Sequence, residues 1–326
     1  MTWDGSDLGL PDLAPLNVVA LGGGHGLSAS LSALRRVVEH VTAIVTVADN
    51  GGSSGRLREE FGVLPPGDLR QALAALCGDD DWGRTWARVL QHRFDSRGPM
   101  HEHAMGNLLI VALWELLGDH VDGLSWVARL LGARGTVLPM SVAPIDITAE
   151  VRGVEEALPA AVTTVRGQVE VASTPGHVLS IDLSPTNPPA CPEALAAVAE
   201  ADWVVLGPGS WFTSVIPHLL VPDLRRALVT APARRAVTLN LAPQTGETEG
   251  FSPEEHLEVL GLYAPDLKLD VVLADERTVT DLAGLRAAAS AFGAELVVAD
   301  VAADDGTPRH DPVKLAIAYA SFLCEA

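Results

Sequence analysis

Cysteine is scarce in this 326-residue sequence, and its scarcity excludes several classes of protein. The three cysteines, Cys77, Cys191 and Cys324, are far apart, and no two have C-x-x-C spacing. An odd number at such distances argues against a disulfide framework and against a zinc module. The pattern suits a protein of the reducing cytoplasm, and we expect that location.

Positive charge is also scarce. The sequence has 22 Lys and Arg against 42 Asp and Glu, so its formal net charge is −20 at pH 7. Lys268 and Lys314 are its only lysines, and the remaining basic residues are arginines, which bind phosphate or carboxylate in a fork. Because so acidic a surface repels nucleic acid and anionic lipid, we expect no nucleic-acid partner. An anionic ligand would have to be held locally by loops and a few arginines.

Long apolar segments are missing as well. No run approaches the ~20 residues of a membrane span, so we expect no membrane insertion. Residues 1–16 are rich in Gly, Pro and Asp and do not resemble a signal peptide; we expect a loose N-terminal leader. Apolar residues make up 48% of the chain, which excludes a disordered protein. We find neither an internal repeat nor a low-complexity linker.

Strand and helix patterns alternate from residue 17 onwards. Residues 17–22 predict a short buried strand, residues 26–40 a helix, and residues 41–49 a second strand. The second strand is almost entirely apolar, as expected of a parallel strand covered on both faces. Helical character then extends over about 65–134.

A β-rich insertion is predicted over about 136–184, and within it the segment VTTVRGQVEV predicts a hairpin or an offset strand pair. Regular alternation then resumes, with strands at 203–206, 236–241, 270–274 and 295–301 and helices at 192–201, from about 213, and at 253–263, 278–292 and 312–323. We predict a doubly wound, mostly parallel, Rossmann-like α/β fold. Residues 17–326 form one domain in this prediction, with the helical excursion and the β-rich insertion inside it.

The first of four polar loops follows the strand at 17–22. Gly24-His25-Gly26-Leu27-Ser28-Ala29 fits the G-x-G-x-x-A pattern, in which backbone N–H groups approach the pyrophosphate of a dinucleotide. Asp49 lies near the distance at which such domains keep their ribose-binding acid. Taken alone, these two features favour NAD.

The residues after Asp49 depart from the dinucleotide pattern. They combine small residues, hydroxyls and arginines in the order Asn50, Gly51, Gly52, Ser53, Ser54, Gly55, Arg56, Leu57 and Arg58. Glycines let backbone N–H groups approach an anion, serine hydroxyls can donate to phosphate oxygens, and arginine binds phosphate bidentately. The combination predicts a site for a diphosphate or a nucleotide-linked phosphate, and a flexible surface turn is the alternative.

Two more loops of this kind follow later strands. The third contains Gly207, Gly209, Ser210, Thr213 and Ser214, whose hydroxyls are equally suited to cap a helix or to bind a ligand. The fourth contributes Asn240 and Gln244. Because the carboxyl ends of parallel strands meet at one edge of a sheet, we expect all four loops to converge there.

Metal and catalytic residues are less clearly indicated. Asp68 and the segment His101-Glu102-His103 each precede a helical stretch, whose N-terminus favours anions. The two histidines lack the i, i+4 spacing of a helical zinc pair, so we do not expect a three-ligand zinc site. A hard cation such as Mg²⁺ near Asp49 or Asp68, shared with ligand phosphates, is favoured instead. No spacing indicates a covalent nucleophile or a catalytic triad.

Seven segments together resemble one known family, the gluconeogenesis-factor (YvcK-like) family within the CofD-like (2-phospho-L-lactate transferase) superfamily. In order, they are ALGGGHGLSASLSALR, TVADNGGSSGRLR, LPPGDLRQAL, HAMGNLLI, VLGPGSWFTSVIPHLLV, LNLAPQTGET and RHDP. They extend over almost the whole chain from about residue 17, and the similarity is greatest to actinobacterial members. The resemblance implies a cytoplasmic protein that binds UDP-sugars such as UDP-N-acetylglucosamine. It also implies a requirement for normal cell shape and wall synthesis on gluconeogenic carbon sources, without an established reaction.

The resemblance also implies ligand-binding positions. They are Gly24, His25, Gly26, Asp49, Gly51, Gly52, Ser53, Ser54, Arg58, Asp68, His103, Asn107, Gly207, Gly209, Ser210, Thr213, Ser214, Asn240, Gln244, Arg309 and His310. The family's second loop usually begins Asp-Asp, whereas this chain has Asp49-Asn50. The loss of one carboxylate weakens the case for Mg²⁺-dependent transfer and affects the recognition of a neutral sugar far less.

Three functional classes therefore stay open. The first is a UDP-sugar-binding regulatory protein that acts on a protein partner in wall synthesis or carbon metabolism, either as a single chain or as a homo-oligomer. The second is a Mg²⁺-dependent transferase of the 2-phospho-L-lactate transferase type, acting on a nucleotide-diphosphate-linked substrate. The third, an NAD(P)-dependent oxidoreductase, lacks a residue that spacing would nominate for proton exchange. Asn50 and the missing nucleophile favour the first class.

Overall fold

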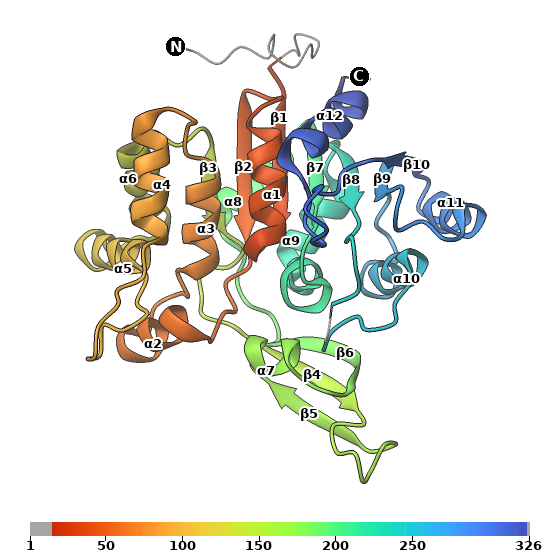
Figure 1. The fold of residues 1–326 in the computed structure, drawn as a ribbon, viewed down its shortest axis with the longest axis horizontal. Helices are drawn as coiled ribbons and strands as arrows, with labels where there is room; N and C mark the ends of the chain where they lie inside the picture. The colour runs from red at the N-terminus through yellow and green to blue at the C-terminus, as the bar shows by residue number, and fades with distance from the viewer. Residues whose placement is uncertain (1–14, 245, 325–326) are drawn as a thin grey trace.

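A parallel β-sheet forms the centre of the protein. The computed structural model describes residues 15–244 and 246–324, so the predicted leader lies almost wholly outside the described residues. Among these residues a seven-stranded sheet has the order β10-β9-β8-β7-β1-β2-β3 (Figure 1). Its strands are β1 (Asn17–Gly22), β2 (His40–Val45), β3 (Thr136–Pro139), β7 (Trp203–Leu206), β8 (Arg234–Thr238), β9 (Val271–Asp275) and β10 (Glu295–Ala299). Every neighbouring pair is parallel, which confirms the predicted fold class.

The chain winds outward in both directions from β1. Strands β2 and β3 follow on one side of β1, and β7 to β10 follow on the other, so the winding direction reverses between β1 and β7. Ala20 of β1 lies opposite Ala43 of β2 and Val205 of β7, and all three side chains are fully buried. Ligands of doubly wound proteins bind where the strand order reverses, outside the carboxyl ends of the strands.

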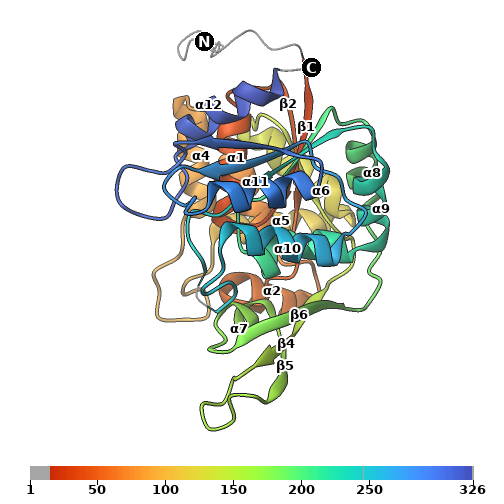
Figure 2. The same ribbon diagram turned by 90° about the vertical axis from the view of Figure 1, so that its right-hand side faces the viewer.

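Helices cover both faces of the sheet (Figures 1 and 2). On one face lie α1 (Gly24–Leu34), α3 (Gly67–Ala75) and α12 (Pro312–Leu323), and on the other lie α8 (Pro192–Ala199) and α9 (Pro222–Thr230). The phenol of Tyr319 in α12 shares hydrogen bonds with Ser30 of α1 at 2.8 Å and Thr238 of β8 at 3.1 Å. These buried hydrogen bonds connect α12 to α1 and to β8. The remaining helices beside the sheet are α10 (Pro253–Tyr263) and α11 (Leu282–Ala291).

The segment predicted to be helical contains α3 and three further helices. These are α4 (Asp81–Gln91), α5 (Met105–Leu117) and α6 (His120–Leu131), which pack beside α3 at one end of the sheet. The Asp80 and Asp119 carboxylates cap α4 and α6 by accepting from backbone N–H groups, and Gly118 and Gly132 end α5 and α6 in the left-handed conformation. No helix within the described ranges is long and apolar enough to cross a membrane.

A small antiparallel sheet lies below the carboxyl edge of the parallel one (Figure 1). It has the order β5-β4-β6, with β4 at Asp146–Arg152, β5 at Val162–Arg166 and β6 at His177–Ser184. The hairpin predicted for VTTVRGQVEV is wrong. Only its first half is a strand, and Gln168–Ala172 forms the short helix α7 instead. The chain turns at Gly167, whose φ of +110° favours glycine, and α7 then packs against loops from distant parts of the sequence.

Several other predicted elements are shorter than expected, including the helices predicted at 192–201 and 278–292 and the strands predicted at 236–241 and 295–301. The helix predicted at 26–40 ends at Leu34, and the strand predicted at 41–49 pairs only as far as Val45. The N–H of Thr46 still donates to the carbonyl of Gly22 at 3.0 Å, and residues 47–49 continue past the sheet, because the neighbouring strands end there. The helix predicted from about residue 213 begins as a π-helical turn, η2 (Trp211–Val215), and a 3-10 helix, η3 (Ile216–Leu220), before α9.

Candidate functional site

The first and third loops are in backbone contact at the point where the strand order reverses. A Cβ atom on Gly26 would lie 2.3 Å from the carbonyl oxygen of Pro208, so only glycine allows the two loops to approach this closely. The Asn240 amide joins the fourth loop to them. Its Oδ1 accepts from the N–H of Gly209 at 2.9 Å, and its Nδ2 donates to the carbonyl of Gly209 at 2.8 Å. The expected convergence of these loops is therefore present.

These loops border a cavity of about 320 Å³, a volume in the range of small-molecule sites. Five predicted residues contribute polar groups to it, and Leu241, Ala242, Pro243 and two further prolines supply an apolar wall. The predicted residues that line it are His25, Gly26, Gly209, Asn240, Gln244, Arg309 and His310. We call it the His25–Arg309 cavity.

Two polar atoms of this cavity's lining residues are buried without a partner among the described residues, Oε1 of Gln244 and Nε2 of His310. The Gln244 Nε2 group donates to the Ser210 hydroxyl at 3.1 Å, which fixes the amide. Burial lowers the pKa of His310 to about 4, so its ring is neutral at pH 7. Unpaired buried polar atoms cost free energy, and a ligand that pairs with them would recover it.

Arg309 reaches the same cavity from the turn before α12. Its guanidinium donates to Asp305 at 2.9 Å and to the Thr307 hydroxyl at 3.0 Å, both within its own turn. Its side chain is 69% exposed. A charged group that is held only locally and is open to solvent can turn toward a ligand without disturbing the core.

Two predicted carboxylates, Asp49 and Asp68, interact with each other, and Asp68 lies against the first loop. Burial, together with the negative charge of Asp49, raises the pKa of Asp68 to about 7, and the N–H of Gly24 opposes this by donating to it. The Asp49 carboxylate accepts from the N–H of Gly51 at 2.8 Å. Mg²⁺ is commonly held by one or two carboxylates and ligand phosphates, so this pair fits such an ion. Among the described residues no cluster of three or more His, Cys, Asp or Glu residues could hold a metal.

Four predicted residues form a buried hydrogen-bond network behind the second loop. The Ser53 hydroxyl contacts Nδ1 of His103 at 3.1 Å and accepts from the Asn107 amide at 3.1 Å. The same amide lies 3.4 Å from the Ser54 hydroxyl, and Asn107 Oδ1 accepts from Nε of Arg70 at 2.8 Å. Their side chains face one another, so they join α2 (Gly52–Phe61), α3 and α5 and position the loop.

Asn50 and Arg58 are directed toward the antiparallel sheet. The Asn50 Nδ2 group donates to Glu170 at 2.7 Å, and its Oδ1 accepts from the N–H of Val169 at 3.0 Å. Arg58 forms an ion pair of 2.6 Å with Asp146 and keeps its Nη1 buried without a partner among the described residues. These two side chains therefore fix α7 and β4 over the carboxyl edge of the sheet.

The third loop depends on a residue that the sequence did not single out. Glu247 is buried and accepts from the N–H groups of Phe212 and Thr213 at 2.9 and 3.3 Å and from the Thr213 hydroxyl at 2.6 Å. Burial raises its pKa. Thr213 is thus committed to Glu247, whereas the Ser214 hydroxyl faces the first loop beside Gly23. No local pattern identifies Glu247, because its partners lie 34 and 35 residues earlier.

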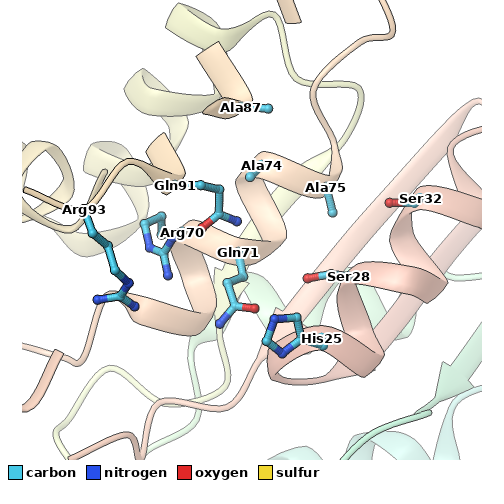
Figure 3. A pocket seen from close by; sticks show the side chains of 10 residues that line it. All are labelled: His25, Ser28, Ser32, Arg70, Gln71, Ala74, Ala75, Ala87, Gln91 and Arg93. Carbon is cyan, nitrogen blue, oxygen red and sulfur yellow. The ribbon is translucent and has the colours of Figure 1, made fainter. Parts of the chain in front are cut away.

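A second cavity, of about 550 Å³, opens between α1, α3 and α4 (Figure 3). It meets the first cavity at His25, which borders both. Its largest side chains are Arg70, Gln71, Gln91 and Arg93, and the predicted ligand residues other than His25 do not line it.

The protein has a Rossmann-like parallel sheet with polar loops at its carboxyl edge, and a small antiparallel sheet lies beside these loops. A family model described as 2-phospho-L-lactate transferase CofD matches residues 18–309, and the chain belongs to this family. Within it, the chain groups with the gluconeogenesis factors. It is 53% identical over 302 residues to a Mycobacterium tuberculosis protein described as a candidate gluconeogenesis factor, covering 92% of this chain and 88% of the relative.

More distant relatives match over almost the whole chain. The gluconeogenesis factor of Listeria monocytogenes is 34% identical over 317 residues, which cover 94% of this chain and 95% of the relative. A crystal structure at 2.60 Å resolution of a UPF0052 family protein from Bacillus halodurans matches with a TM-score of 0.81 and 32% identity. The match covers 93% of this chain and 98% of that one. The predicted family is thereby confirmed.

Proposed function

We propose that the protein binds a UDP-sugar, of which UDP-N-acetylglucosamine is the model, and acts as a regulatory protein without turnover. The observation that carries this proposal is the His25–Arg309 cavity, where the first, third and fourth loops meet the turn before α12. The buried Gln244 Oε1 and His310 Nε2 have no partner there among the described residues. A nucleoside offers hydrogen-bonding groups to both atoms, and the apolar wall suits a flat ring.

The diphosphate would lie across the start of α1. Backbone N–H groups at a helix N-terminus favour negative charge, and no atom lies within 4 Å of the position that a Cβ would take on Gly24, which leaves room there for phosphate oxygens. Arg309 supplies the only arginine side chain that lines this cavity within the described residues, and its fork suits a phosphate. The sugar would then extend toward Asp68 and Ser214, which lie beside Gly23 and whose carboxyl and hydroxyl oxygens can accept from sugar hydroxyls.

The biological part of the proposal follows the names of the relatives. We infer a cytoplasmic protein that supports cell shape and wall synthesis during growth on gluconeogenic carbon sources, and that passes its ligand state to a protein partner. The description gluconeogenesis factor supports this context. The small antiparallel sheet projects from the body next to the loops, so it is well placed to carry a ligand signal to a partner (Figure 1).

One observation favours a second function, transfer of a group from a nucleotide diphosphate. The Asp49 and Asp68 carboxylates lie close enough for the charge of Asp49 to raise the pKa of Asp68. A divalent cation held there would neutralise phosphate charge and stabilise a leaving diphosphate. Against this, the oxygen of Asn50 already accepts from Val169, so the second loop supplies one carboxylate instead of two.

Calorimetry with a matched pair of variants tests the binding proposal. Gln244→Leu removes the unpartnered oxygen of the His25–Arg309 cavity, whereas Gln91→Leu makes the same change in the other cavity. We expect Gln244→Leu to weaken UDP-N-acetylglucosamine at least about tenfold, or ~1.4 kcal/mol, and Gln91→Leu to leave its affinity within about twofold. Equal affinities for both variants would place the nucleotide elsewhere. Release of UDP during incubation with Mg²⁺ would favour the transferase.

A further inference from the structure

The cavity between α1, α3 and α4 is positively charged in a strongly acidic protein. Arg70 and Arg93 both line it, and no Asp or Glu residue is among its lining residues, although the chain has a net charge of −20 (Figure 3). Two arginines that share a cavity without a carboxylate between them repel each other unless an anion lies there.

Arg70 is held in place with its charged end free. The residue is only 4% exposed, and its Nε donates to Asn107 Oδ1 at 2.8 Å. Its two terminal nitrogens make no hydrogen bond or ion pair with any described residue. Asp49 and Asp68 act on it only through space. The guanidinium is thus a buried, positioned cation that faces the cavity.

Arg93, which follows α4, supplies a second guanidinium beside that of Arg70 (Figure 3). Its Nη1 donates to the carbonyl of Glu102 at 2.8 Å, which fixes the side chain and leaves its other nitrogens open to the cavity. In Figure 3 the Arg70 guanidinium lies between that of Arg93 and the Gln71 amide. The Gln71 amide donates to Asp68 at 3.5 Å and keeps a second N–H that can donate to a ligand. Two forks and an amide match the three terminal oxygens and the charge, about −2, of a phosphate monoester.

The rest of the lining indicates what the phosphate is attached to. Ser28, Ser32 and Gln91 offer hydroxyl and amide groups, and the apolar surface consists only of the methyl groups of Ala74, Ala75 and Ala87. No Phe, Tyr or Trp ring lines the cavity, and its one ring, the imidazole of His25, also borders the His25–Arg309 cavity. Hydroxyl-rich molecules pair well with such a lining, and about 550 Å³ accommodates a sugar-sized group.

We propose that this cavity is a second ligand site, which binds a small phosphorylated polyol with its phosphate between Arg70 and Arg93. The site is separate from the His25–Arg309 cavity, so this inference goes beyond the proposed UDP-sugar function and does not depend on it. Only His25 is common to the two cavities, which allows both ligands to be bound at once.

Calorimetry with glucose 6-phosphate as the probe tests this proposal on the full chain, beside glucose and inorganic phosphate. We expect glucose 6-phosphate to bind, inorganic phosphate to bind more weakly, and glucose not to bind. Arg93→Gln and Arg70→Gln should each weaken the probe at least about tenfold. Arg88→Gln is the matched control, because it removes the same charge from an exposed position on α4 outside the cavity, and it should change the affinity less than about twofold.

Several results would overturn the proposal. One is the absence of saturable binding by the natural protein, and another is an equal loss of affinity in Arg88→Gln. Equal affinities for glucose 6-phosphate and inorganic phosphate would show that the polyol part is not recognised. Failure of glucose 6-phosphate to bind once the protein is saturated with UDP-N-acetylglucosamine would show that the two sites are not separate. Because Arg70 is buried, Arg70→Gln can fail to fold. The exposed Arg93 then carries the test, together with Ser32→Leu, which fills the cavity without changing charge.

Discussion

Asn50 and Glu170 form a hydrogen bond of 2.7 Å between residues 120 positions apart, from the amide of the second loop to the carboxylate of α7. The Asn50 carbonyl accepts from the N–H of Val169, so one side chain binds α7 through both of its polar atoms. An aspartate at this position would keep the acceptor, lose the donor and place a negative charge against Glu170. The asparagine at position 50, where the family usually has a second aspartate, is therefore matched by its contacts with Glu170 and Val169 of α7.

Replacement of Asn50 tests this contact. Asn50→Asp should loosen α7 by about 1 kcal/mol, because a hydrogen bond is replaced by a repulsion. Hydrogen exchange of the amides at 168–172 should accelerate. It should slow again in the double variant Asn50→Asp, Glu170→Gln, where the side-chain amide introduced on α7 can donate to the carboxylate introduced in the second loop. Unchanged exchange in Asn50→Asp would show that other contacts hold α7.

The dependence of ligand binding on Mg²⁺ distinguishes a binder from a transferase. We expect the UDP-N-acetylglucosamine affinity of the natural protein to differ by less than about threefold between EDTA and millimolar Mg²⁺, because the second loop provides only Asp49. The dependence should grow in the double variant Asn50→Asp, Glu170→Gln, with Glu170→Gln alone as the control for α7. Complete loss of the ligand in EDTA would instead favour the transferase.

We expect Arg309 to contribute to ligand affinity and not to the stability of the fold. Its side chain is 69% exposed and contacts only its own turn, so Arg309→Ala should leave the melting temperature of the unliganded protein nearly unchanged. Loss of a charged donor to phosphate should weaken UDP-N-acetylglucosamine about tenfold. Arg286→Ala, on the exposed face of α11, is the control. Unaltered binding in Arg309→Ala would remove this residue from the site.

His310 gives the unfolding free energy a pH dependence of known sign. Its pKa is lowered from 6.5 to about 4 by burial, so between these values the unfolded chain takes up a proton that the folded one does not. Stability is therefore fully present above pH 6.5 and falls as the pH decreases to about 4. His218, whose pKa burial also lowers to about 4, contributes in the same direction.

Denaturant titrations between about pH 4 and 8 measure this effect. His310→Gln should reduce the decrease in unfolding free energy between about pH 6.5 and 4 by about 1–3 kcal/mol. His40→Gln, which removes an exposed histidine, is the control. A profile of His310→Gln that parallels the natural one would show that His310 is protonated in the folded protein.

The parts of the fold that follow from local physics were predictable. The strand Asn17–Gly22 and the helices Pro253–Tyr263 and Pro312–Leu323 have the bounds that the sequence predicts, because an apolar run marks the strand and proline follows an N-cap at each helix. The hairpin prediction at VTTVRGQVEV failed for the opposite reason. Val169 and Val171 have β-branched side chains, yet their helix is fixed by Asn50 and by Gly167, which local propensity does not include.

The candidate site was predictable to a similar degree. Glycine and polar loops after parallel strands predicted that Gly26, Gly209 and Asn240 would meet, and they do. The sequence did not reveal Glu247, which binds the third loop, or the free guanidinium of Arg70. The role of each residue depends on residues far away in the sequence that pack beside it, and local sequence patterns do not identify those residues.

The central claim is that the glycine loop before α1 serves a UDP-sugar and not a dinucleotide. Calorimetric titration of the natural protein with UDP-N-acetylglucosamine and with NAD, under identical conditions, tests it most directly. We predict that UDP-N-acetylglucosamine binds at least about ten times more tightly than NAD, a difference of ~1.4 kcal/mol. Binding of NAD with equal or higher affinity would contradict the account.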